Sequence, residues 1–473
     1  MADTAAHTSE PSSSIHVVLL PYPSQGHINP ILQFGKRLAA AHRGRVRCTL
    51  AATRFLLSNS QPSACTGGDA IRIAAISDGC DRGGRAEAAG AVEYLSRLES
   101  AGSETVDQLL RSAEAEQAGR PVDVLVYDAF LPWAQRVARR RGVPCAVFFT
   151  QPCAVDVVYA HARAGRVRPP LVGDEPVELP GLSVALRPVD MPSFLADPSG
   201  YPSYLDLLLN QFDGLHTADH VLVNSFYELQ PQESDYMASA WRAKTVGPTV
   251  PSAYLDNTLP EDTSYGFHLY TPETAATRAW LDSMPPRSVV YAAFGSVAEP
   301  TAAQMAEVAE GLYSSGKPFL WVVRASETSK IPDKFADKAN ERGLVATWSA
   351  QLEVLAHPAV GCFVTHCGWN STTEGLSAGV PMVAMPQWSD QPVNAKYIED
   401  VWRVGVRVRP DKDGVVRKEE VERCVREVMD GERSMEYQQN AADWKEKARK
   451  AMSAGGSSDN NIKEFLGKLG LKV

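Results

Sequence analysis

The sequence contains few cysteines and none in a C-x-x-C pair. Eight cysteines are spread over 473 residues, which is too sparse for a disulfide framework and lacks the paired spacing of a zinc ribbon. Cys362, His366 and Cys367 lie near one another. However, Cys362 stands inside an apolar run, and no fourth ligand follows at a suitable spacing. We therefore expect reduced thiols and no metal ion.

Excess positive charge and long apolar runs are also absent. Lys and Arg total 47 against 56 Asp and Glu, a formal net charge of -9, which disfavours binding to nucleic acid or to an anionic membrane surface. No run of 18 apolar residues occurs, and residues 1–14 lack the basic start and apolar stretch of a secretory signal. We expect a disordered segment over residues 1–14, no membrane insertion, a cytoplasmic location and a monomer.

Short apolar runs rich in Val, Ile and Phe alternate with longer segments of helical period. This alternation predicts parallel strands joined by crossover helices. The chain is too long for one ordinary core, so we predict an α/β protein with two doubly wound parallel-sheet domains that face each other across a cleft. The predicted strands are residues 15–20, 46–51, 71–76, 122–127, 144–150 and 220–224 in the first group, and 288–294, 318–323, 343–347, 360–365, 380–386 and 405–408 in the second.

The predicted domains are residues 15–245 and 287–455. Between them, at residues 246–286, the periodicity fails and prolines accumulate, as expected of a linker. Residues 456–473 are predicted to form a final helical segment that packs back on the body. Because parallel sheets bind ligands outside the carboxyl ends of their strands, we expect the functional site in the cleft.

The segment of residues 348–391 is the richest in candidate ligand-binding side chains. A strand is predicted to end just before His366 and a helix to begin near Asn370 or Ser371. The unpaired N–H groups and positive dipole end of a helix start favour a diphosphate, and these three side chains can add donors. Trp348, at a strand end, can stack on a flat base or belong to the core.

Glu374 has two interpretations. Ser371 and Glu374 fit a capping box, in which the two side chains satisfy the first N–H groups of the helix. Alternatively, the Glu374 carboxylate accepts hydrogen bonds from ribose hydroxyls, as acidic residues do beside dinucleotide sites. The residues alone leave both interpretations open.

Two residues at strand ends in the first half fit general base catalysis. His27 lies in the predicted loop after the first strand, and Asp128 ends the apolar strand of residues 122–127. Histidine suits proton transfer near neutral pH, and a carboxylate that accepts its second N–H fixes the tautomer. Each residue also has a plain structural interpretation, since His27 can cap a helix and Asp128 can start a turn.

Three other patterns point to different chemistry but lack the required context. Residues 375–379 fit the G-x-S-x-G of α/β-hydrolases, but Ser377 lies in a predicted helix and no histidine follows it. Residues 411–413 match the D-x-D of metal-dependent glycosyltransferases, but the following glycine predicts a hairpin turn. The turn after the first strand contains a single glycine, Gly26, so the G-x-G-x-x-G motif of nicotinamide-dependent dehydrogenases is missing.

Residues 348–391 resemble the signature box of plant secondary-product UDP-sugar glycosyltransferases, which has the 44 positions of this segment. The match includes the first tryptophan, the string H-C-G-W-N-S, the glutamate three residues later and the final D-Q. Similar strings are P-S-Q-G-H-I-N-P near the start, F-G-S at 294–296 and K-Y-I-E-D-V-W after the box. The family usually has proline in place of Ala350, where the implied contact is through the backbone.

The resemblance implies an inverting UDP-glucosyltransferase of the two-Rossmann GT-B type that needs no metal and no cofactor besides its co-substrate UDP-glucose. Its first domain would bind a small, partly hydrophobic acceptor with a hydroxyl or carboxyl group, and its second domain the donor. A catalytically inactive nucleotide-sugar binding protein is the alternative, which the pair His27 and Asp128 disfavours.

The resemblance also implies roles for individual residues. Trp348 would stack on uracil, while Gln351 and Glu374 would hold the ribose. The implied UDP site consists of Ser296, Trp348, Ala350, Gln351, His366, Asn370, Ser371 and Glu374, the sugar site of Thr150, Trp369, Asp390 and Gln391, the catalytic pair of His27 and Asp128, and the acceptor pocket of Phe130, Gln151, Met191, Phe194 and Tyr201.

Overall fold

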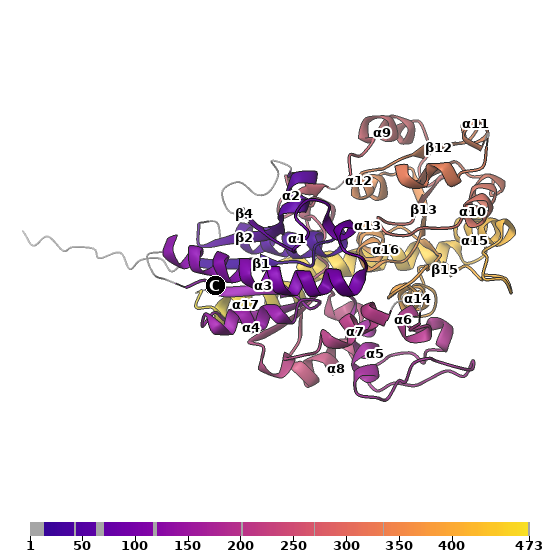
Figure 1. Ribbon diagram of the computed structural model, residues 1–473. Coiled ribbons are helices and arrows are strands. Elements are labelled where there is room, and N and C mark those ends of the chain that lie inside the picture. The colour runs from indigo at the N-terminus through magenta and orange to yellow at the C-terminus, as the bar shows by residue number, and fades with distance from the viewer. Residues whose placement is uncertain are drawn as a thin grey trace, which may run out of the picture.

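The computed structural model describes residues 14–41, 44–62, 71–116, 121–199, 202–268, 270–333 and 335–471. Apart from Ser14, the segment predicted to be disordered lies outside these residues. Two parallel sheets form the framework, one in each half of the chain, which confirms the predicted fold class (Figure 1). In spatial order, the first sheet contains β4 (Ile71–Ile76), β2 (Val46–Thr53), β1 (Ile15–Leu20), β5 (Val124–Asp128), β6 (Cys145–Phe149), β7 (His220–Val223) and β8 (Lys244–Thr245), and the second contains β12 (Gly343–Ala346), β11 (Phe319–Val322), β10 (Val289–Ala293), β13 (Val360–Thr365), β14 (Met382–Ala384) and β15 (Gly405–Arg407).

Every predicted strand is present, because strands covered on both faces are apolar throughout. In β1, for example, all six residues are buried. No pattern in the sequence predicts β8, which is two residues long, or the small antiparallel pair of β3 (Gln61–Pro62) and β9 (Phe267–His268). These segments are too short to show a period.

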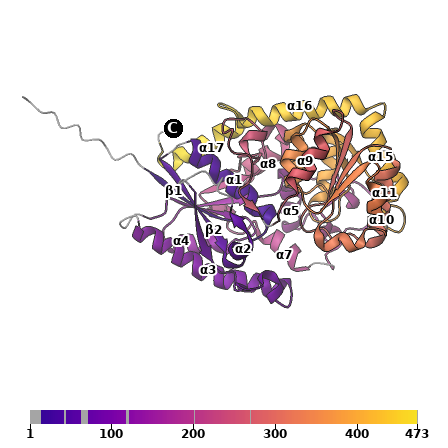
Figure 2. The same cartoon turned by 90° about the horizontal axis from the view of Figure 1, so that it is seen from above.

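Helices flank the sheets. Seen from above, the first sheet runs between α1 with α17 on one side and α3 with α4 on the other (Figure 2). None of the helices in the described ranges is long and apolar enough to cross a bilayer. The helices are α1 (Gln25–Ala41), α2 (Arg54–Asn59), α3 (Ala91–Glu116), α4 (Trp133–Arg140), α5 (Cys153–Arg163), α6 (Ser193–Ala196), α7 (Pro202–Asn210), α8 (Pro231–Trp241), α9 (Thr274–Asp282), α10 (Ala302–Ser314), α11 (Phe335–Ala339), α12 (Gln351–Ala356), α13 (Trp369–Ala378), α14 (Gln391–Lys396), α15 (Lys418–Asp430), α16 (Ser434–Met452) and α17 (Ser457–Lys468).

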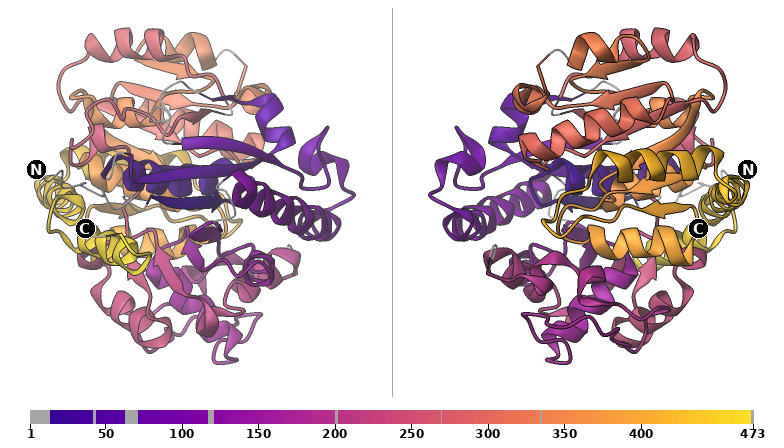
Figure 3. Two further views of the ribbon diagram at one scale, coloured as in Figure 1. Left: turned by 90° about the vertical axis from the view of Figure 1, so that its left-hand side faces the viewer. Right: turned by 90° about the vertical axis from the view of Figure 1, so that its right-hand side faces the viewer.

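The chain returns to the first sheet at its C-terminal end. The long helix α16 runs back from the second half of the molecule, and α17 packs beside β8 (Figures 2 and 3). Ser458 Oγ donates to the carbonyl of Gly247 at 2.6 Å, and Asn461 Nδ2 donates to that of Thr245 at 2.9 Å. The last helix therefore ties the two halves of the chain together.

The two halves of the chain are also connected by the segment of residues 252–265, which we call the strap. It lies against α1, where Lys36 Nζ is 2.5 Å from Asp262 Oδ1. Both side chains are nearly buried, at 4% and 6% exposed. One helical position further, the Arg37 guanidinium makes a two-point contact with the carboxylate of Asp256. The strap is thus fixed to the helix that carries His27.

Each sheet has a point at which successive connections run in opposite directions. In the first sheet β1 lies between β2 and β5, and in the second β10 lies between β11 and β13. Ligands of open α/β sheets bind outside the carboxyl ends of the strands at such points. The ends of β1 and β5 and those of β10 and β13 therefore locate the site.

Candidate active site

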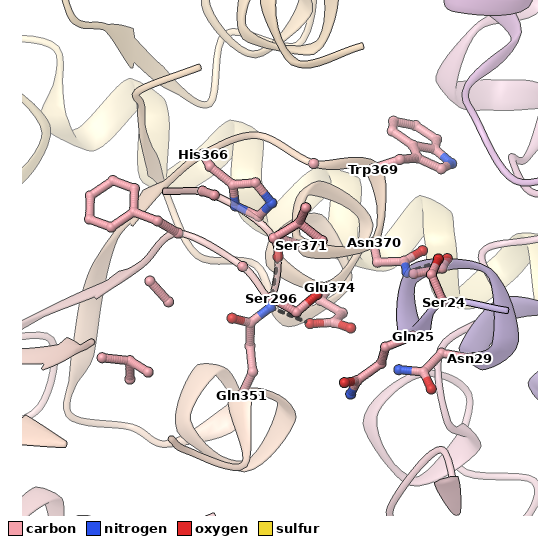
Figure 4. A pocket seen from close by; sticks show the side chains of 18 of the residues that line it. Ser24, Gln25, Asn29, Ser296, Gln351, His366, Trp369, Asn370, Ser371 and Glu374 are labelled. Carbon is pink, nitrogen blue, oxygen red and sulfur yellow. Dashed lines mark hydrogen bonds between the residues drawn. The ribbon is translucent and has the colours of Figure 1, made fainter. Parts of the chain in front are cut away.

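A cavity of about 560 Å³ lies between the carboxyl ends of the two sheets. In Figure 4, Ser24, which directly precedes α1, and Gln25 and Asn29 of α1 face the side chains of Gln351 and Glu374 across it. Most of the residues implied by the resemblance line this cavity: His27, Phe130, Thr150, Gln151, Phe194, Ser296, Trp348, Ala350, Gln351, His366, Trp369, Asn370, Ser371, Glu374, Asp390 and Gln391.

His27 and Asp128 form a hydrogen-bonded pair. His27 Nδ1 is 2.7 Å from Asp128 Oδ2, and the Asp128 side chain is 0% exposed. Because a carboxylate only accepts, Nδ1 carries the proton and Nε2, on the other side of the ring, is left as an acceptor. Thr150 Oγ1 lies 3.1 Å from the same Nδ1. Such a pair can act as a general base with an orienting carboxylate.

The sheet brings these three residues together because β1, β5 and β6 are adjacent parallel strands. The rings of Tyr22 and Phe130 flank the imidazole, with centroids 5.3 Å and 4.7 Å from that of His27. His27 lies in the first turn of α1 rather than in a loop, so the predicted loop over this segment is wrong. The helix begins at Gln25 and accommodates Pro30 near its start.

That proline also explains a contact between the domains. Pro30 has no N–H, so the helix leaves the carbonyl of Gly26, four residues earlier, without its usual donor. Asn370 Nδ2, at the start of α13 in the second domain, donates to this carbonyl at 2.9 Å. Asn370, implied as a diphosphate ligand, therefore holds α1 against the donor side of the cavity in this structure.

Glu374 is a buried carboxylate within α13 and does not cap it. The helix begins at Trp369 with Gly368 at the N-cap, so Ser371 and Glu374 are its third and sixth residues. Glu374 Oε1 accepts from the Tyr265 hydroxyl at 2.8 Å. The capping-box interpretation is wrong, because the N-cap is Gly368 and not Ser371, whereas the predicted helix start near residue 370 or 371 lies within two residues of the observed start.

Gln351 completes the network around Glu374. Its Nε2 donates to Glu374 Oε2 at 2.6 Å and to Ser371 Oγ at 2.9 Å, while its Oε1 accepts from the Tyr291 hydroxyl at 3.1 Å (Figure 4). Burial raises the pKa of Glu374 to about 6, although its hydrogen bonds with Gln351 and Tyr265 oppose the rise. A carboxylate has about four acceptor positions, so two remain for a pair of hydroxyl groups.

His366 lies between two glycines at the ends of β10 and β13. A Cβ on Gly295 would come within 2.6 Å of His366 Nε2, and one on Gly368 within 2.5 Å. Gly295 also has a positive φ of 76°, which other residues rarely adopt. Burial lowers the pKa of His366 to about 4, so the imidazole is neutral at neutral pH. It can therefore serve as a neutral hydrogen-bond donor to an anion.

The residues implied for the sugar lie at the end of the cavity nearest the first domain. Trp369 Nε1 donates to the carbonyl of Asn224 at 2.6 Å, which fixes its ring. Gln391 Oε1 accepts from the backbone N–H groups of residues 387 and 388 at 2.8 Å and 3.0 Å, so its amide N–H groups remain for a ligand. Burial raises the pKa of Asp390 to about 6, although a hydrogen bond from Asn394 opposes the rise.

Ser296, Trp348 and Ala350 lie on the opposite wall. Arg324 Nη1 donates to the Ser296 carbonyl at 2.8 Å and so holds the loop after β10. The Trp348 indole stacks on Tyr270 with centroids 4.3 Å apart. Ala350 is the N-cap of α12, which places Gln351 at the first position of that helix.

The implied acceptor pocket is only partly assembled. Phe130, Gln151 and Phe194 line the cavity, but Met191 is 1% exposed and is not among the lining residues. An ion pair between Asp190 and Arg407, at 2.6 Å, holds the preceding residue against β15. Tyr201 lies outside the described residues. Arg85, Tyr204 and Tyr265 also line the cavity but were not predicted as site residues, because they lie in segments with no recognisable motif.

The two competing motifs do not form sites. Ser377 is 2% exposed inside α13 and not on a strand-to-helix turn, so the hydrolase interpretation is wrong. Asp411 accepts from the backbone N–H of Asp413 at 2.8 Å and from Arg417 Nε at 2.6 Å, which commits it to the predicted turn. No group of three His, Cys, Asp or Glu side chains suited to a metal occurs within the described ranges.

Comparisons with known proteins agree with this geometry. The family model described as UDP-glucoronosyl and UDP-glucosyl transferase matches residues 258–444. The chain is 51% identical over 455 residues to UDP-glucosyltransferase UGT13248 of Hordeum vulgare subsp. vulgare, covering 96% of this chain and 94% of that protein. The crystal structure of Os79 from O. sativa in complex with UDP superimposes with a TM-score of 0.88 at 49% identity, covering 96% of this chain and 100% of that one.

Proposed function

Since the chain belongs to the family of UDP-glucuronosyl and UDP-glucosyl transferases, we propose that it transfers glucose from UDP-glucose to a small, partly hydrophobic metabolite. It is a glycosyltransferase that uses a UDP-sugar and a small-molecule acceptor. The observation that carries the proposal is His27 on one wall of the cavity, hydrogen-bonded to the buried Asp128 and opposite the Gln351–Glu374 network on the other wall. The name of the relative from Hordeum vulgare subsp. vulgare, a UDP-glucosyltransferase, supports glucose as the sugar.

In the proposed mechanism, His27 Nε2 takes the proton of the acceptor hydroxyl as its oxygen attacks the anomeric carbon. The bond between that carbon and the diphosphate oxygen breaks, and the electron pair leaves with UDP. Asp128 stabilises the imidazolium that forms. Because the acceptor itself is the nucleophile, one displacement inverts the anomeric carbon and no covalent glycosyl-enzyme forms.

The developing charge on UDP is neutralised by fixed dipoles. The N-terminus of α13 points unpaired N–H groups at the cavity, and neutral His366 and Ser371 add donors beside it. We propose on this basis that transfer needs no metal. The monomeric state and the cytoplasmic location stay predictions.

For the rest of the donor, we propose that Trp348 stacks on uracil and that Glu374 binds the ribose hydroxyls. Glu374 must be ionised to accept two further hydrogen bonds. Because its pKa is raised to about 6, we expect the KM for UDP-glucose to rise as the pH falls through 6. UDP-glucose suits this measurement, since a terminal phosphate of free UDP would itself titrate at about 6.

Glu374→Gln separates this effect from other titrations. The variant should have a higher KM for UDP-glucose at pH 7.5 and a flatter dependence on pH between roughly 5 and 7. Asp390→Asn is the control, because Asp390 has a pKa of about 6 as well but is proposed to contact the sugar. If the KM of Glu374→Gln for UDP-glucose still rises as steeply as that of the wild-type protein when the pH falls through 6, the assignment of Glu374 to the ribose is wrong.

The function itself is tested with a panel of UDP-sugars and acceptors. The purified protein is incubated with UDP-glucose, UDP-galactose or UDP-glucuronic acid and a mixture of phenolic, terpenoid and carboxylic acceptors. We expect UDP-glucose to give products heavier by one hexose. UDP-sugar binding without transfer to any acceptor would favour the inactive binding protein instead.

A further inference from the structure

Arg85 places a positive charge at the acceptor end of the cavity. It belongs to η2 (Gly84–Glu87), in the segment between β4 and α3, and its guanidinium carbon lies 5.3 Å from the centre of the Tyr204 ring. Arg324 also lines the cavity, but it donates to backbone carbonyls of the loop after β10. Among the described residues, Arg85 is the arginine of the cavity whose side chain makes no hydrogen bond to the protein.

The acidic residues near η2 are committed elsewhere. Asp81 pairs with Arg54 at 2.8 Å, and Glu87 accepts from the backbone N–H of Arg82 at 2.7 Å. Asp78 accepts from the N–H of Cys80 at 2.9 Å and from the Tyr94 hydroxyl at 3.1 Å. Within the described part of the chain, no carboxylate forms an ion pair with Arg85, so its donors remain available to a ligand.

The surfaces around Arg85 are mostly apolar and aromatic. Tyr22, Phe130, Phe194, Leu208 and Trp388 line the same end of the cavity. An acceptor that fills this space displaces water from the guanidinium, and an unpaired cation in such surroundings is costly. An acceptor carboxylate offsets that cost, because its two oxygens match the paired donors of a guanidinium.

Tyr22 relates Arg85 to the catalytic pair. Its ring centroid is 5.3 Å from that of His27. Burial raises the pKa of Tyr22, and the nearby Arg85 cation opposes the rise. Arg85, Tyr22 and His27 all line the same cavity, so a molecule bound there has both the guanidinium and the imidazole in its walls.

We propose that the preferred acceptor is a hydroxy acid with an aromatic or alicyclic body. Its carboxylate binds Arg85, and its hydroxyl group lies at His27 and receives the glucose. This inference rests on the proposed function and narrows its acceptor from any hydroxyl or carboxyl compound to molecules that carry both groups. Arg85 is then a specificity residue for the acceptor and takes no part in the bond exchange.

The test compares a charged acceptor with its neutral ester, 4-hydroxycinnamate and methyl 4-hydroxycinnamate, each with UDP-glucose. The phenolic glucoside is quantified after mild alkali, which removes any glucose ester. We expect the wild-type protein to prefer the acid. Arg85→Met should raise the KM for the acid by about 10- to 100-fold, the range for a hydrogen bond to a charged group, with little change in kcat and in the kinetics of the ester.

Arg82→Met is the matched control, since Arg82 is also exposed but lies outside the cavity. It should leave both acceptors unchanged. The inference is overturned if the wild-type protein uses the ester as well as the acid, or if Arg85→Met weakens both equally. Transfer to the ester by all variants would then leave the proposed function intact.

A separate outcome concerns the donor. If UDP-glucose gives no product with either acceptor, the proposed function fails, and calorimetric titration of the acid into the UDP-bound protein still decides the role of Arg85. Tighter binding of the acid than of the ester, lost in Arg85→Met, supports the inference. Equal binding of the two by the wild-type protein overturns it.

Discussion

His27→Ala is expected to lower kcat for transfer to a hydroxyl acceptor by about 100- to 10,000-fold, the usual contribution of a general base. The KM for UDP-glucose should change little, because His27 lies on the acceptor side of the cavity. Steady-state kinetics with a phenolic acceptor measure both quantities. An acceptor that reacts through its carboxylate arrives already deprotonated, so kcat for transfer to it should fall much less in His27→Ala.

Asp128→Asn tests the second half of the pair. An amide can donate to His27 Nδ1 and would then hold the imidazole in the other tautomer, so kcat should fall although the fold is kept. His216→Ala is the control, since His216 is exposed and outside the cavity. A His27→Ala variant with nearly wild-type transfer to the phenolic acceptor would show that another group takes the proton.

The largest loss of stability is expected for Lys36→Met. Lys36 Nζ donates to Asp262 Oδ1 at 2.5 Å and to the carbonyl of Ser264 at 2.6 Å. Its removal leaves the Asp262 charge nearly buried with only neutral donors, which costs about 3 to 5 kcal/mol. A domain of this size loses roughly 2 to 4 °C in Tm for each kcal/mol, so a scanning measurement should show a fall of at least about 6 °C.

The same variant should also weaken donor binding. The strap that Lys36 anchors carries Tyr265, whose hydroxyl orients Glu374, so the KM for UDP-glucose should rise more than kcat falls. Lys463→Met is the control, because the Lys463–Asp459 pair on α17 is 43% and 20% exposed and pairs of that kind contribute at most about 1 kcal/mol. Equal stability of the two variants would contradict this role of the strap.

The framework and most of the cavity wall were predictable because their signals are local. Buried parallel strands are continuous apolar runs, and a residue that follows such a run lies at the carboxyl edge of the sheet. This is why His27, Asp128 and the segment after β13 could be placed from sequence. The long Trp348–Gln391 match then implied the donor residues one by one.

Other features were not predictable because they depend on pairs that are distant in the chain. Lys36 and Asp262 are 226 residues apart, and Tyr265 and Glu374 are 109 apart. Neither pair leaves a periodic pattern. Met191 was expected in the acceptor pocket because the resemblance implies a pocket in the loops of the first domain, but its apolar character does not distinguish a cavity wall from the core. Arg85 was overlooked because a single arginine in a loop is usually solvated.

UDP-glucose is proposed to donate its sugar in a single inverting displacement. The stereochemistry is followed by NMR in the presence of a chelator, with UDP-glucose and a phenolic acceptor. We predict that the α-anomeric signal of UDP-glucose is replaced by that of a β-linked glucoside alone, formed in the same amount as UDP. An α-linked product, or UDP released without any glucoside, would contradict the claim.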